Sequence, residues 1–405
     1  MNWHRARVLV LVIAISALFL GMASRAAVLK PAASPNRVQG SKTAYRSSPP
    51  PDASIAYRSS SLQGSRVTHG NPLKDSTGAP ISCPDPNVTL QHRGAWRYYL
   101  VCTSDNAGDA FPIWVSNDLA HWTRQGFVFP HGHQPWWAVP STGGGRRGIY
   151  WAPELYYFGG RWVVYFAAQY NPASRALRFS PNGDLPPGTM VIGAATADSL
   201  TGPWHTRILH YPGQFNSVNS EQEVHGGVID PSVTRDRATG QLYLFWAKQQ
   251  NEIWAGALSA DGLTLDTHVH RILKVSEPWE CDPANSECTI EGPEAHYHNG
   301  YFYVFYSAAS TWDSTYALGI AASTQADDPS HPFVKHPRPI LVAGNGFLGP
   351  ASSSHPVVGK DGNTYLLYHA LTRPSMSHNS ADRLLMLGRL NWGGFWPLVN
   401  DGHSS

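Results

Sequence analysis

The chain has 405 residues, which is enough for one large domain or two ordinary ones. Charged residues make up 14% of the chain and the formal net charge is +2, so the composition gives no electrostatic reason to expect a nucleic-acid partner. The 15 tryptophans and 18 tyrosines suit an all-β fold, in which aromatic side chains fill pleated surfaces, and they also suit a sugar-binding cleft.

The first 26 residues have the pattern of a secretory signal peptide. Two arginines in residues 1–7 precede an uncharged apolar run over residues 8–22, and Ser24-Arg25-Ala26 supplies small residues where a cleavage site is expected. The run is shorter than the roughly 20 residues that a transmembrane helix needs. We therefore predict a secreted, extracellular protein without membrane attachment once residues 1–26 are removed. An uncleaved membrane anchor is the alternative.

Composition divides the rest of the chain into a linker and one folded domain. Residues 27–79 are rich in Ser, Pro, Ala and Gly and have almost no apolar periodicity, which is typical of a flexible linker. From about Ile81 onward, short apolar and aromatic runs alternate with Gly, Asp and Asn turns, and no amphipathic helix of useful length is present. We expect a folded domain over residues 80–400.

All four cysteines lie in this domain. An even number of cysteines in an exported chain favours disulfides over metal ligation. We predict the pairs Cys83–Cys102 and Cys281–Cys288, each of which closes a short loop, with buried free thiols as the alternative.

One pattern recurs five times along the domain: a short strand containing a proline, a turn ending in glycine, and an aromatic-aliphatic strand. The aromatic strands cover residues 98–103, 162–167, 242–247, 302–307 and 364–369. The prolines that precede them are Pro86, Pro153, Pro231, Pro293 and Pro356. A further strand often follows each pair. Five such units without helices between them predict an all-β, five-bladed β-propeller rather than a β-sandwich.

In a propeller the first strand of each blade faces the central axis, so matched positions converge there. The residues that precede the repeated prolines are Asp85, Ala152, Asp230, Gly292 and His355, and Glu291 precedes Gly292. A single Asp-Pro pair is most often turn chemistry. Recurrence at one phase in several blades favours an axial site instead, because unpaired carboxylates are rarely buried without a function.

The segments around these carboxylates resemble glycoside hydrolase family 43. The resemblance is carried by CPDPNV, YWAPELYYFGGRWVVYF, IDPSV and IEGPEAHYHNGYFYVFY, and by WVSNDLAHWTRQG at the end of the first repeat. It spans roughly residues 80–392, and its specificity lies in the order and spacing of the three acidic motifs. It implies an inverting glycosidase that cleaves arabinose- or xylose-containing polymers and oligomers.

The resemblance also implies a role for each carboxyl. Asp85 matches the general base, Glu291 matches the general acid, and Asp230 matches the third carboxylate, which orients the acid and keeps its pKa raised. Inversion requires a protonated carboxyl at the leaving oxygen and a carboxylate roughly 6.5–9.5 Å away that activates water. A third carboxylate beside the acid disfavours ionisation of the acid.

Other residues complete the expected site. Trp151 and Trp114 are candidates for a sugar platform, and His355 is a candidate substrate-binding residue because its phase matches that of Asp85. Glu294 is expected to point to the opposite face from Glu291, because three residues separate them in a strand. Glu154 is likewise expected to point away from the axis. No catalytic metal and no required cofactor are expected, although the axis is a place where a structural calcium ion could bind.

Two other functions fit part of this pattern. One is a retaining propeller glycosidase of the β-fructosidase type, although such enzymes carry Glu-Cys and Arg-Asp-Pro where this chain has Glu-Gly-Pro and Ile-Asp-Pro. The other is a non-catalytic carbohydrate-binding propeller, against which the presence of all three carboxylates argues. In either case the expected partner is a polysaccharide or oligosaccharide, and the expected state is a monomer.

Overall fold

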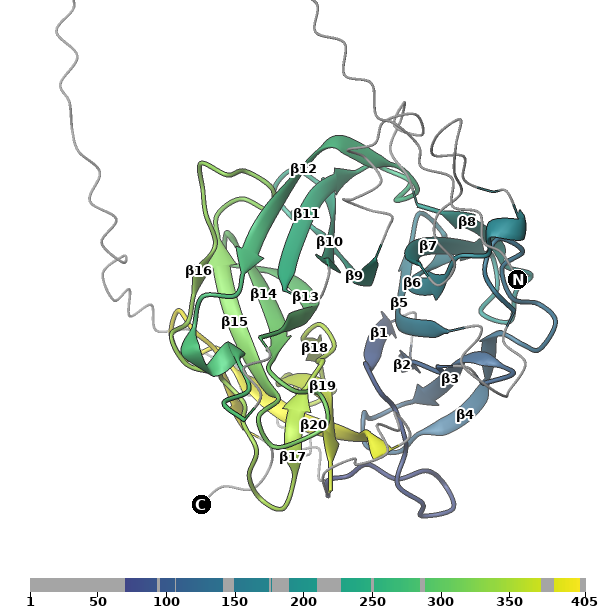
Figure 1. Cartoon of the computed structure of the whole chain (residues 1–405). Helices are drawn as coiled ribbons and strands as arrows, with labels where there is room; N and C mark the ends of the chain where they lie inside the picture. Colours follow the sequence, from purple (N-terminus) through teal and green to yellow (C-terminus); the bar gives the residue numbers. More distant parts are fainter. Residues whose placement is uncertain are drawn as a thin grey trace, which may run out of the picture. The chain divides into compact units, whose positions relative to one another are not determined.

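The computed structural model describes residues 70–400 except 93–94, 106, 141–148, 175, 177–188, 210–226, 249–250, 285–287 and 373–381. The signal segment and most of the expected linker lie outside these residues. The described part forms five antiparallel sheets arranged as blades around an axis (Figure 1). The prediction of an all-β, five-bladed propeller is therefore confirmed. No helix in the described part is long and apolar enough to cross a membrane.

Each blade runs outward from the axis, with its strands in sequence order. Blades 1 and 2 contain β1 (Asn87–His92), β2 (Trp96–Val101), β3 (Ala110–Ser116), β4 (Thr123–Phe129), β5 (Tyr150–Phe158), β6 (Arg161–Gln169), β7 (Met190–Ala197) and β8 (His205–Ile208). Blades 3 and 4 contain β9 (Val228–Arg235), β10 (Leu242–Lys248), β11 (Glu252–Leu258), β12 (Leu265–Lys274), β13 (Ile290–His298), β14 (Tyr301–Ala308), β15 (Ala317–Ser323) and β16 (Val334–Lys335). Blade 5 contains β17 (Leu348–Ala351), β18 (Val357–Val358), β19 (Thr364–Leu371), β20 (Leu384–Asn391) and β21 (Leu398–Asn400). Two short 3₁₀ helices connect strands in the described part of the chain: η1 (Pro172–Ser174) and η3 (Pro278–Glu280).

The repeated X-Pro pair forms a β-bulge in the inner strand. In blade 4, Glu291 pairs with Ser307 and Glu294 pairs with Phe305, so three steps on β13 match two steps on β14. The register of blades 2 and 3 shifts in the same way around Ala152-Pro153 and Asp230-Pro231. A bulge accommodates proline because the residue there does not need to donate to the ladder.

The first residue of each bulge adopts the left-handed conformation. The φ angles are 49° at Asp85, 42° at Ala152, 56° at Asp230, 55° at Gly292 and 44° at Ser352. The fifth-blade member of this set is Ser352 and not His355, so the expected phase of His355 is wrong. Blade 5 has Ser352-Ser353 where the others have X-Pro, and His355 lies three residues further along the strand.

These left-handed residues donate their amide N–H groups to the preceding blade. The N–H groups of Ala152, Gly292 and Ser352 donate to Thr103 Oγ1 (2.7 Å), Asp230 Oδ2 (2.9 Å) and Ser307 Oγ (2.8 Å). The N–H of Asp85 donates to Nδ1 of His369 at 3.2 Å, which joins the first blade to the last. The left-handed backbone thus directs one hydrogen bond across each of these four blade boundaries.

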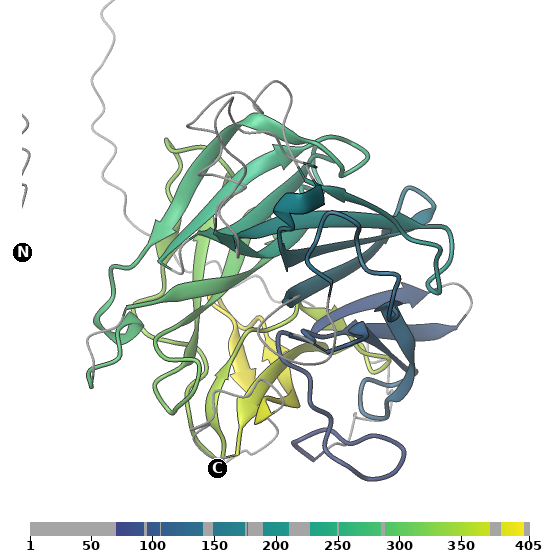
Figure 2. The same ribbon diagram turned by 45° about the vertical axis from the view of Figure 1, so that its right-hand side comes forward.

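The start of the folded chain closes the ring against blade 5. Leu73 N donates to Leu385 O at 2.8 Å, Leu385 N donates to Ile81 O at 2.9 Å, and Cys83 N donates to Arg383 O at 3.0 Å. Figures 1 and 2 show the purple-blue first blade beside the yellow last blade. The fold therefore includes residues from about 71, ahead of the boundary expected at residue 80.

Both predicted disulfides are confirmed. Cys83–Cys102 ties the entry of blade 1 to the end of its second strand, and Cys281–Cys288 closes a loop ahead of β13. No free cysteine is present.

The left-handed bulge predicts opposite effects of two substitutions at Ala152. We expect Ala152→Gly to raise the free energy of unfolding by about 1 kcal/mol or less, because glycine adopts positive φ without steric cost. We expect Ala152→Val to lower it by about 2 kcal/mol, because a β-branched residue is a strong outlier there. Urea denaturation measures both. Ala167→Gly in regular strand β6 is the control and should destabilise; stabilisation by Ala152→Val would contradict the bulge.

Candidate active site

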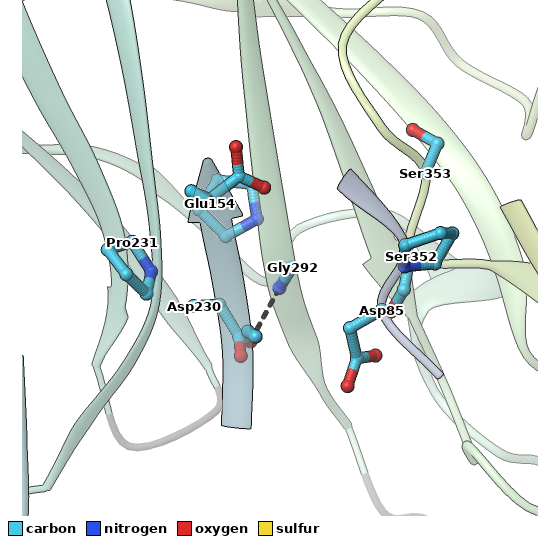
Figure 3. A pocket seen from close by; sticks show the side chains of 10 residues that line it. Asp85, Glu154, Asp230, Pro231, Gly292, Ser352 and Ser353 are labelled. Carbon is cyan, nitrogen blue, oxygen red and sulfur yellow. Dashed lines mark hydrogen bonds between the residues drawn. The ribbon is translucent and has the colours of Figure 1, made fainter. Parts of the chain in front are cut away.

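The bulges surround a cavity on the propeller axis. Its lining is contributed by all five blades and consists of Asp85, Pro86, Ala152, Glu154, Asp230, Pro231, Gly292, Pro293, Ser352 and Ser353. Figure 3 shows the carboxyl groups of Asp85 and Asp230 within this ring, with Asp230 bonded to the amide of Gly292. Glu291, directly before the fourth bulge, is 7% exposed.

Asp85 is held as a carboxylate. Arg383 Nη1 donates to Asp85 Oδ1 at 3.0 Å, and Thr103 Oγ1 donates to Oδ2 at 2.7 Å. Burial opposes the ionisation of Asp85, but the positive charge of Arg383, together with His369 and these hydrogen bonds, outweighs burial. The pKa of Asp85 therefore lies below its usual value, which suits a group that must accept a proton from water.

His369 supports Asp85 as a neutral ring. Burial first, and then the charge of Arg383, lowers the pKa of His369 to about 3. Its Nδ1 accepts the N–H of Asp85, and this assigns the ring proton to Nε2. Arg383 is therefore the cation that faces Asp85.

Glu291 has the opposite electrostatic environment. Tyr316 Oη and Thr311 Oγ1 both donate to Glu291 Oε1, at 2.8 and 3.0 Å. Burial nevertheless raises the pKa of Glu291, and the negative charge of Asp85 raises it further. Because both donors use Oε1, the second oxygen can carry the proton of an acid.

Asp230 shares this high-pKa environment. Burial raises the pKa of Asp230 well above its usual value, and the neighbouring charges of Glu291 and Asp85 add to that effect in this order. Two buried carboxyls that interact in this way retain a proton at pH values where an exposed carboxyl is ionised. The axial site thus combines one ionised carboxylate with a proton-retaining pair.

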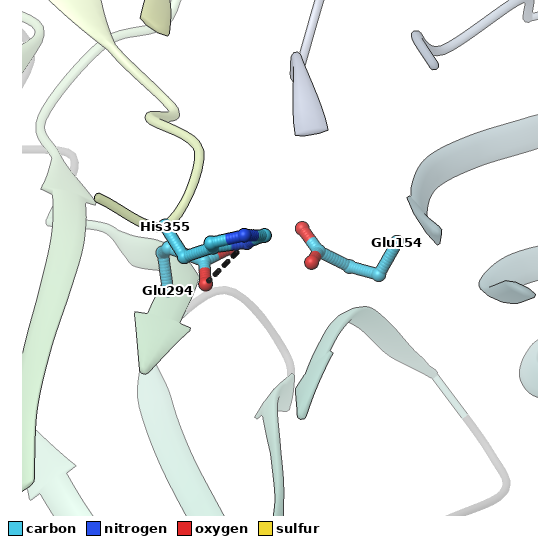
Figure 4. Close-up of side chains that lie close together, drawn as sticks. All are labelled: Glu154, Glu294 and His355. Carbon is cyan, nitrogen blue, oxygen red and sulfur yellow. Dashed lines mark ion pairs between the residues drawn. The ribbon is translucent and has the colours of Figure 1, made fainter. Parts of the chain in front are cut away.

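A second group of titratable residues lies next to these along the axis. Ligand atoms of Glu154, Glu294 and His355 all lie within 4.8 Å of one another, and Figure 4 shows the three side chains converging. His355 Nδ1 is 3.8 Å from Glu294 Oε1. We call these residues the axial cluster.

The positions of Glu154 and Glu294 correct two sequence predictions. Both were expected to point away from the axis, yet Glu154 is 8% exposed and lines the cavity, and Glu294 is 1% exposed. The bulge is the physical reason. Because it inserts one residue, Glu294 returns to the same face as Glu291, and Glu154 returns to the same face as Trp151.

The axial cluster has the donor chemistry of a cation site. Burial raises the pKa of Glu154 to about 8 and that of Glu294 well above its usual value, and each carboxyl is affected by the other. Burial lowers the pKa of His355 to about 4, so its ring is neutral. Glu294 Oε2 has no fixed hydrogen-bond donor in the described part of the chain. Two carboxylates and a neutral imidazole fit a divalent cation, with water completing the oxygen ligands that calcium prefers.

The three expected substrate-binding residues occupy different environments. Trp151 is the second residue of β5 and directly precedes Ala152 of the cavity lining, and its Nε1 donates to Asp105 Oδ1 at 2.7 Å. Trp114, in β3, is partly buried and packs against a hydrophobic core shared by blades 1 and 5, and it does not line the cavity. Its role in a sugar platform stays a prediction. His355 belongs to the axial cluster and not to the ring around Asp85.

Sequence reasoning missed several residues of the site, among them Arg383, Trp312 and His369. Arg383 pairs with Asp85 across 298 positions of sequence, and no motif marks it. Trp312 lies 5.6 Å from the Arg383 guanidinium, in the loop that also carries Thr311. His369 ends the fifth aromatic strand at the position that Ser307 occupies in the fourth, so the repeat alignment contained a signal for it.

A propeller that places a carboxylate and a proton-retaining carboxyl pair on its axis has the layout of a hydrolase acting on glycosidic bonds. The sequence model of glycosyl hydrolases family 43 matches residues 79–397, and the chain belongs to this family.

Individual relatives are distant. A xylosidase/arabinosidase of Butyrivibrio fibrisolvens is 25% identical over 338 residues, covering 79% of this chain and 55% of that protein. The extracellular endo-alpha-(1->5)-L-arabinanase 1 of Bacillus subtilis is 24% identical over 322 residues, covering 77% of this chain and 86% of that protein. The chain thus spans about half the length of the first relative and most of the second.

Solved structures show the same fold. A thermostable family-43 glycoside hydrolase superposes with a TM-score of 0.63 at 23% identity, covering 84% of this chain and 98% of the other. The α-L-arabinofuranosidase from Lactobacillus brevis superposes with a TM-score of 0.61 at 22% identity, covering 83% and 97%.

The environment of Asp85 predicts how activity responds to loss of Arg383. Arg383 lowers the pKa of both Asp85 and Glu291, so in Arg383→Met both values rise. The base sets the acidic limb of the profile, and a raised pKa means that the base is already protonated, and inactive, at a higher pH. The acid sets the basic limb, and a raised pKa means that the acid keeps its proton to a higher pH. Both limbs of the kcat/KM profile should therefore move to higher pH.

Arg389→Met is the matched control, because exposed Arg389 lies in β20, the strand that Arg383 directly precedes, and bonds Asn363 instead. Its profile should coincide with that of the wild type. A pH-independent loss of activity in Arg383→Met would show that Arg383 acts only on the substrate.

Proposed function

We propose that this protein is a secreted, inverting glycoside hydrolase that acts on arabinose- or xylose-containing plant-type polysaccharides or oligosaccharides. The observation that carries the proposal is the opposite pKa shift of Asp85 and Glu291 in one axial site. Inversion needs this division of labour between an ionised base and a protonated acid. The xylosidase/arabinosidase and arabinanase relatives support the sugar class.

Each carboxyl has one role in the proposed reaction. Glu291 donates its proton to the leaving glycosidic oxygen, while Asp85 accepts a proton from the water that attacks the opposite face of the sugar. Asp230 interacts electrostatically with Glu291, and this interaction disfavours loss of the Glu291 proton before the glycosidic bond breaks. Arg383 and Thr103 hold Asp85 ionised and oriented.

A non-catalytic sugar-binding propeller is the second candidate, and the same observation speaks against it. A binding module gains nothing from burying three carboxyls whose pKa values move in opposite directions, because each buried charge opposes folding. The retaining β-fructosidase alternative predicts a first product with retained anomeric configuration, which NMR distinguishes from an inverted one.

The proposal of secretion rests on residues 1–26 and on relatives from Bacillus subtilis and Streptomyces chartreusis that are described as extracellular. Two disulfides fit an oxidising compartment. The protein acts as a monomer on its glycan in this proposal.

The reaction as proposed requires no cofactor. The axial cluster holds a structural calcium ion in this proposal, with Glu154, Glu294 and His355 as its protein ligands. Bound calcium would supply positive charge that neutralises the two carboxylates and ties blades 2, 4 and 5 together at the axis.

The carboxyl roles predict distinct mutant kinetics. Asp85→Asn should lower kcat by roughly 10²–10⁴-fold or more with any substrate, because no other group activates the water. Glu291→Gln should be less harmful with a dinitrophenyl glycoside than with a natural linkage, because that leaving group needs no proton. Glu294→Gln is the control and should leave the dependence on leaving group unchanged. NMR of the first product should show inverted anomeric configuration; retention would reject the mechanism.

The calcium proposal predicts a metal-dependent melting temperature. Removal of calcium by EGTA should lower the Tm by a few degrees, because a ligand at a hundredfold excess over its Kd adds about 2.7 kcal/mol of stability. Glu294→Gln should abolish this response, whereas Glu252→Gln, which alters an outer-strand carboxylate paired with Arg271, should retain it. An identical Tm with and without EGTA in the wild type would reject the proposal.

A further inference from the structure

A second cavity lies at the other end of the propeller axis. The catalytic cavity is lined by early residues of the inner strands, such as Ala152 and Asp230, whereas this one is lined by late residues, such as Phe158 and Arg235. Ala152 and Phe158 are six residues apart on one strand, which corresponds to about 20 Å. The second cavity has a volume of about 370 Å³, within the range of small-molecule sites, roughly 300–1,000 Å³.

The walls of this cavity combine rings with a few polar groups. Four lining residues are aromatic, namely Tyr156, Tyr157, Phe158 and His296, and Thr234 and Arg235 lie among the remaining lining residues. Arg235 is the only Lys, Arg, Asp or Glu among the described residues of this lining. A neutral ligand with apolar faces and a hydroxyl rim matches these walls better than an ion does.

A row of aromatic side chains continues from the cavity onto the surface. The His296 ring, which lines the cavity, stacks on Trp392 at a centroid distance of 6.0 Å, and His298 stacks on the same indole at 4.1 Å. Beyond them, Tyr301 packs edge-on against Phe395 at 5.0 Å, and Phe395 is 39% exposed. We call these five residues the aromatic tract. It joins the β13–β14 turn to the loop between β20 and β21.

We propose that this cavity and the aromatic tract form a second, non-catalytic binding site for a neutral pentose-rich glycan chain. The inference rests on the proposed function, which makes such a chain the substrate. Sugar rings have C–H faces that pack on aromatic rings and hydroxyls that bond polar tips. Because a polymer can reach both ends of the axis, holding one segment here raises the effective concentration of the next segment at the catalytic cavity.

The experiment compares glycan binding with hydrolysis disabled. In an Asp85→Asn background of the full chain, affinity for soluble linear arabinan and for arabinoxylan is measured by affinity electrophoresis and calorimetry. Trp392→Ala and Phe395→Ala should each weaken binding of one of these polymers about tenfold or more, because ring contacts dominate such interfaces. Trp392→Phe should restore most of the affinity.

Trp204→Ala is the matched control, since Trp204 is a partly buried tryptophan that precedes β8 in blade 2 and packs against a different core. It should leave polymer affinity unchanged. Circular dichroism and the Tm of each variant separate loss of binding from loss of folding, and Phe395→Ala tests the site with a side chain that is already 39% exposed.

Three results would overturn the second site. One is unchanged polymer affinity in folded Trp392→Ala and Phe395→Ala. Another is polymer binding that a short oligosaccharide filling the catalytic cavity abolishes completely. The third is a wild-type dimer, seen by analytical ultracentrifugation, that Trp392→Ala dissociates, because the tract would then be an interface between two copies. If the wild type instead hydrolyses no pentose glycoside, the proposed function fails, independently of these binding results.

Discussion

The structure depends on a residue with a left-handed backbone at the first position of each inner-strand bulge, and in four of the five blades that residue is strained because it is not glycine. Its left-handed backbone turns an amide N–H sideways, toward an acceptor on the preceding blade, and four such bonds are present. Strain of this kind persists only where the surroundings compensate for it. Here the compensation is closure of the ring, because Asp85 bonds His369 and thereby links the first blade to the last.

The same arrangement creates the electrostatics of the site. The acceptors that receive the amides are also catalytic-site groups: Asp230 accepts from Gly292, and Thr103 both accepts from Ala152 and donates to Asp85. Burial at the axis raises every carboxyl pKa unless a cation opposes it. Arg383 is placed against Asp85 and not against Asp230, so one carboxyl is ionised while its neighbours retain a proton.

The bulge also determines what lies beyond the catalytic ring. By restoring Glu154 and Glu294 to the axial face, it builds a second layer of titratable groups directly behind the first. Past that layer lies the second cavity, whose lining includes several aromatic residues. One local backbone irregularity, repeated around the ring, thus organises three successive zones along a single axis: catalytic carboxyls, axial cluster and aromatic cavity.

Sequence alone determined the number of blades, the disulfide pairs and the axial positions of Asp85 and Asp230, because hairpin spacing and X-Pro recurrence are local patterns. Only the tertiary structure decided the phase of blade 5, where Ser352 replaces the expected His355, and the inward direction of Glu294. The repeated X-Pro pair marks where each bulge lies, but it does not show that the alternation of side chains changes there. Arg383 likewise could not be found, because its partner lies 298 residues away and meets it only when the ring closes.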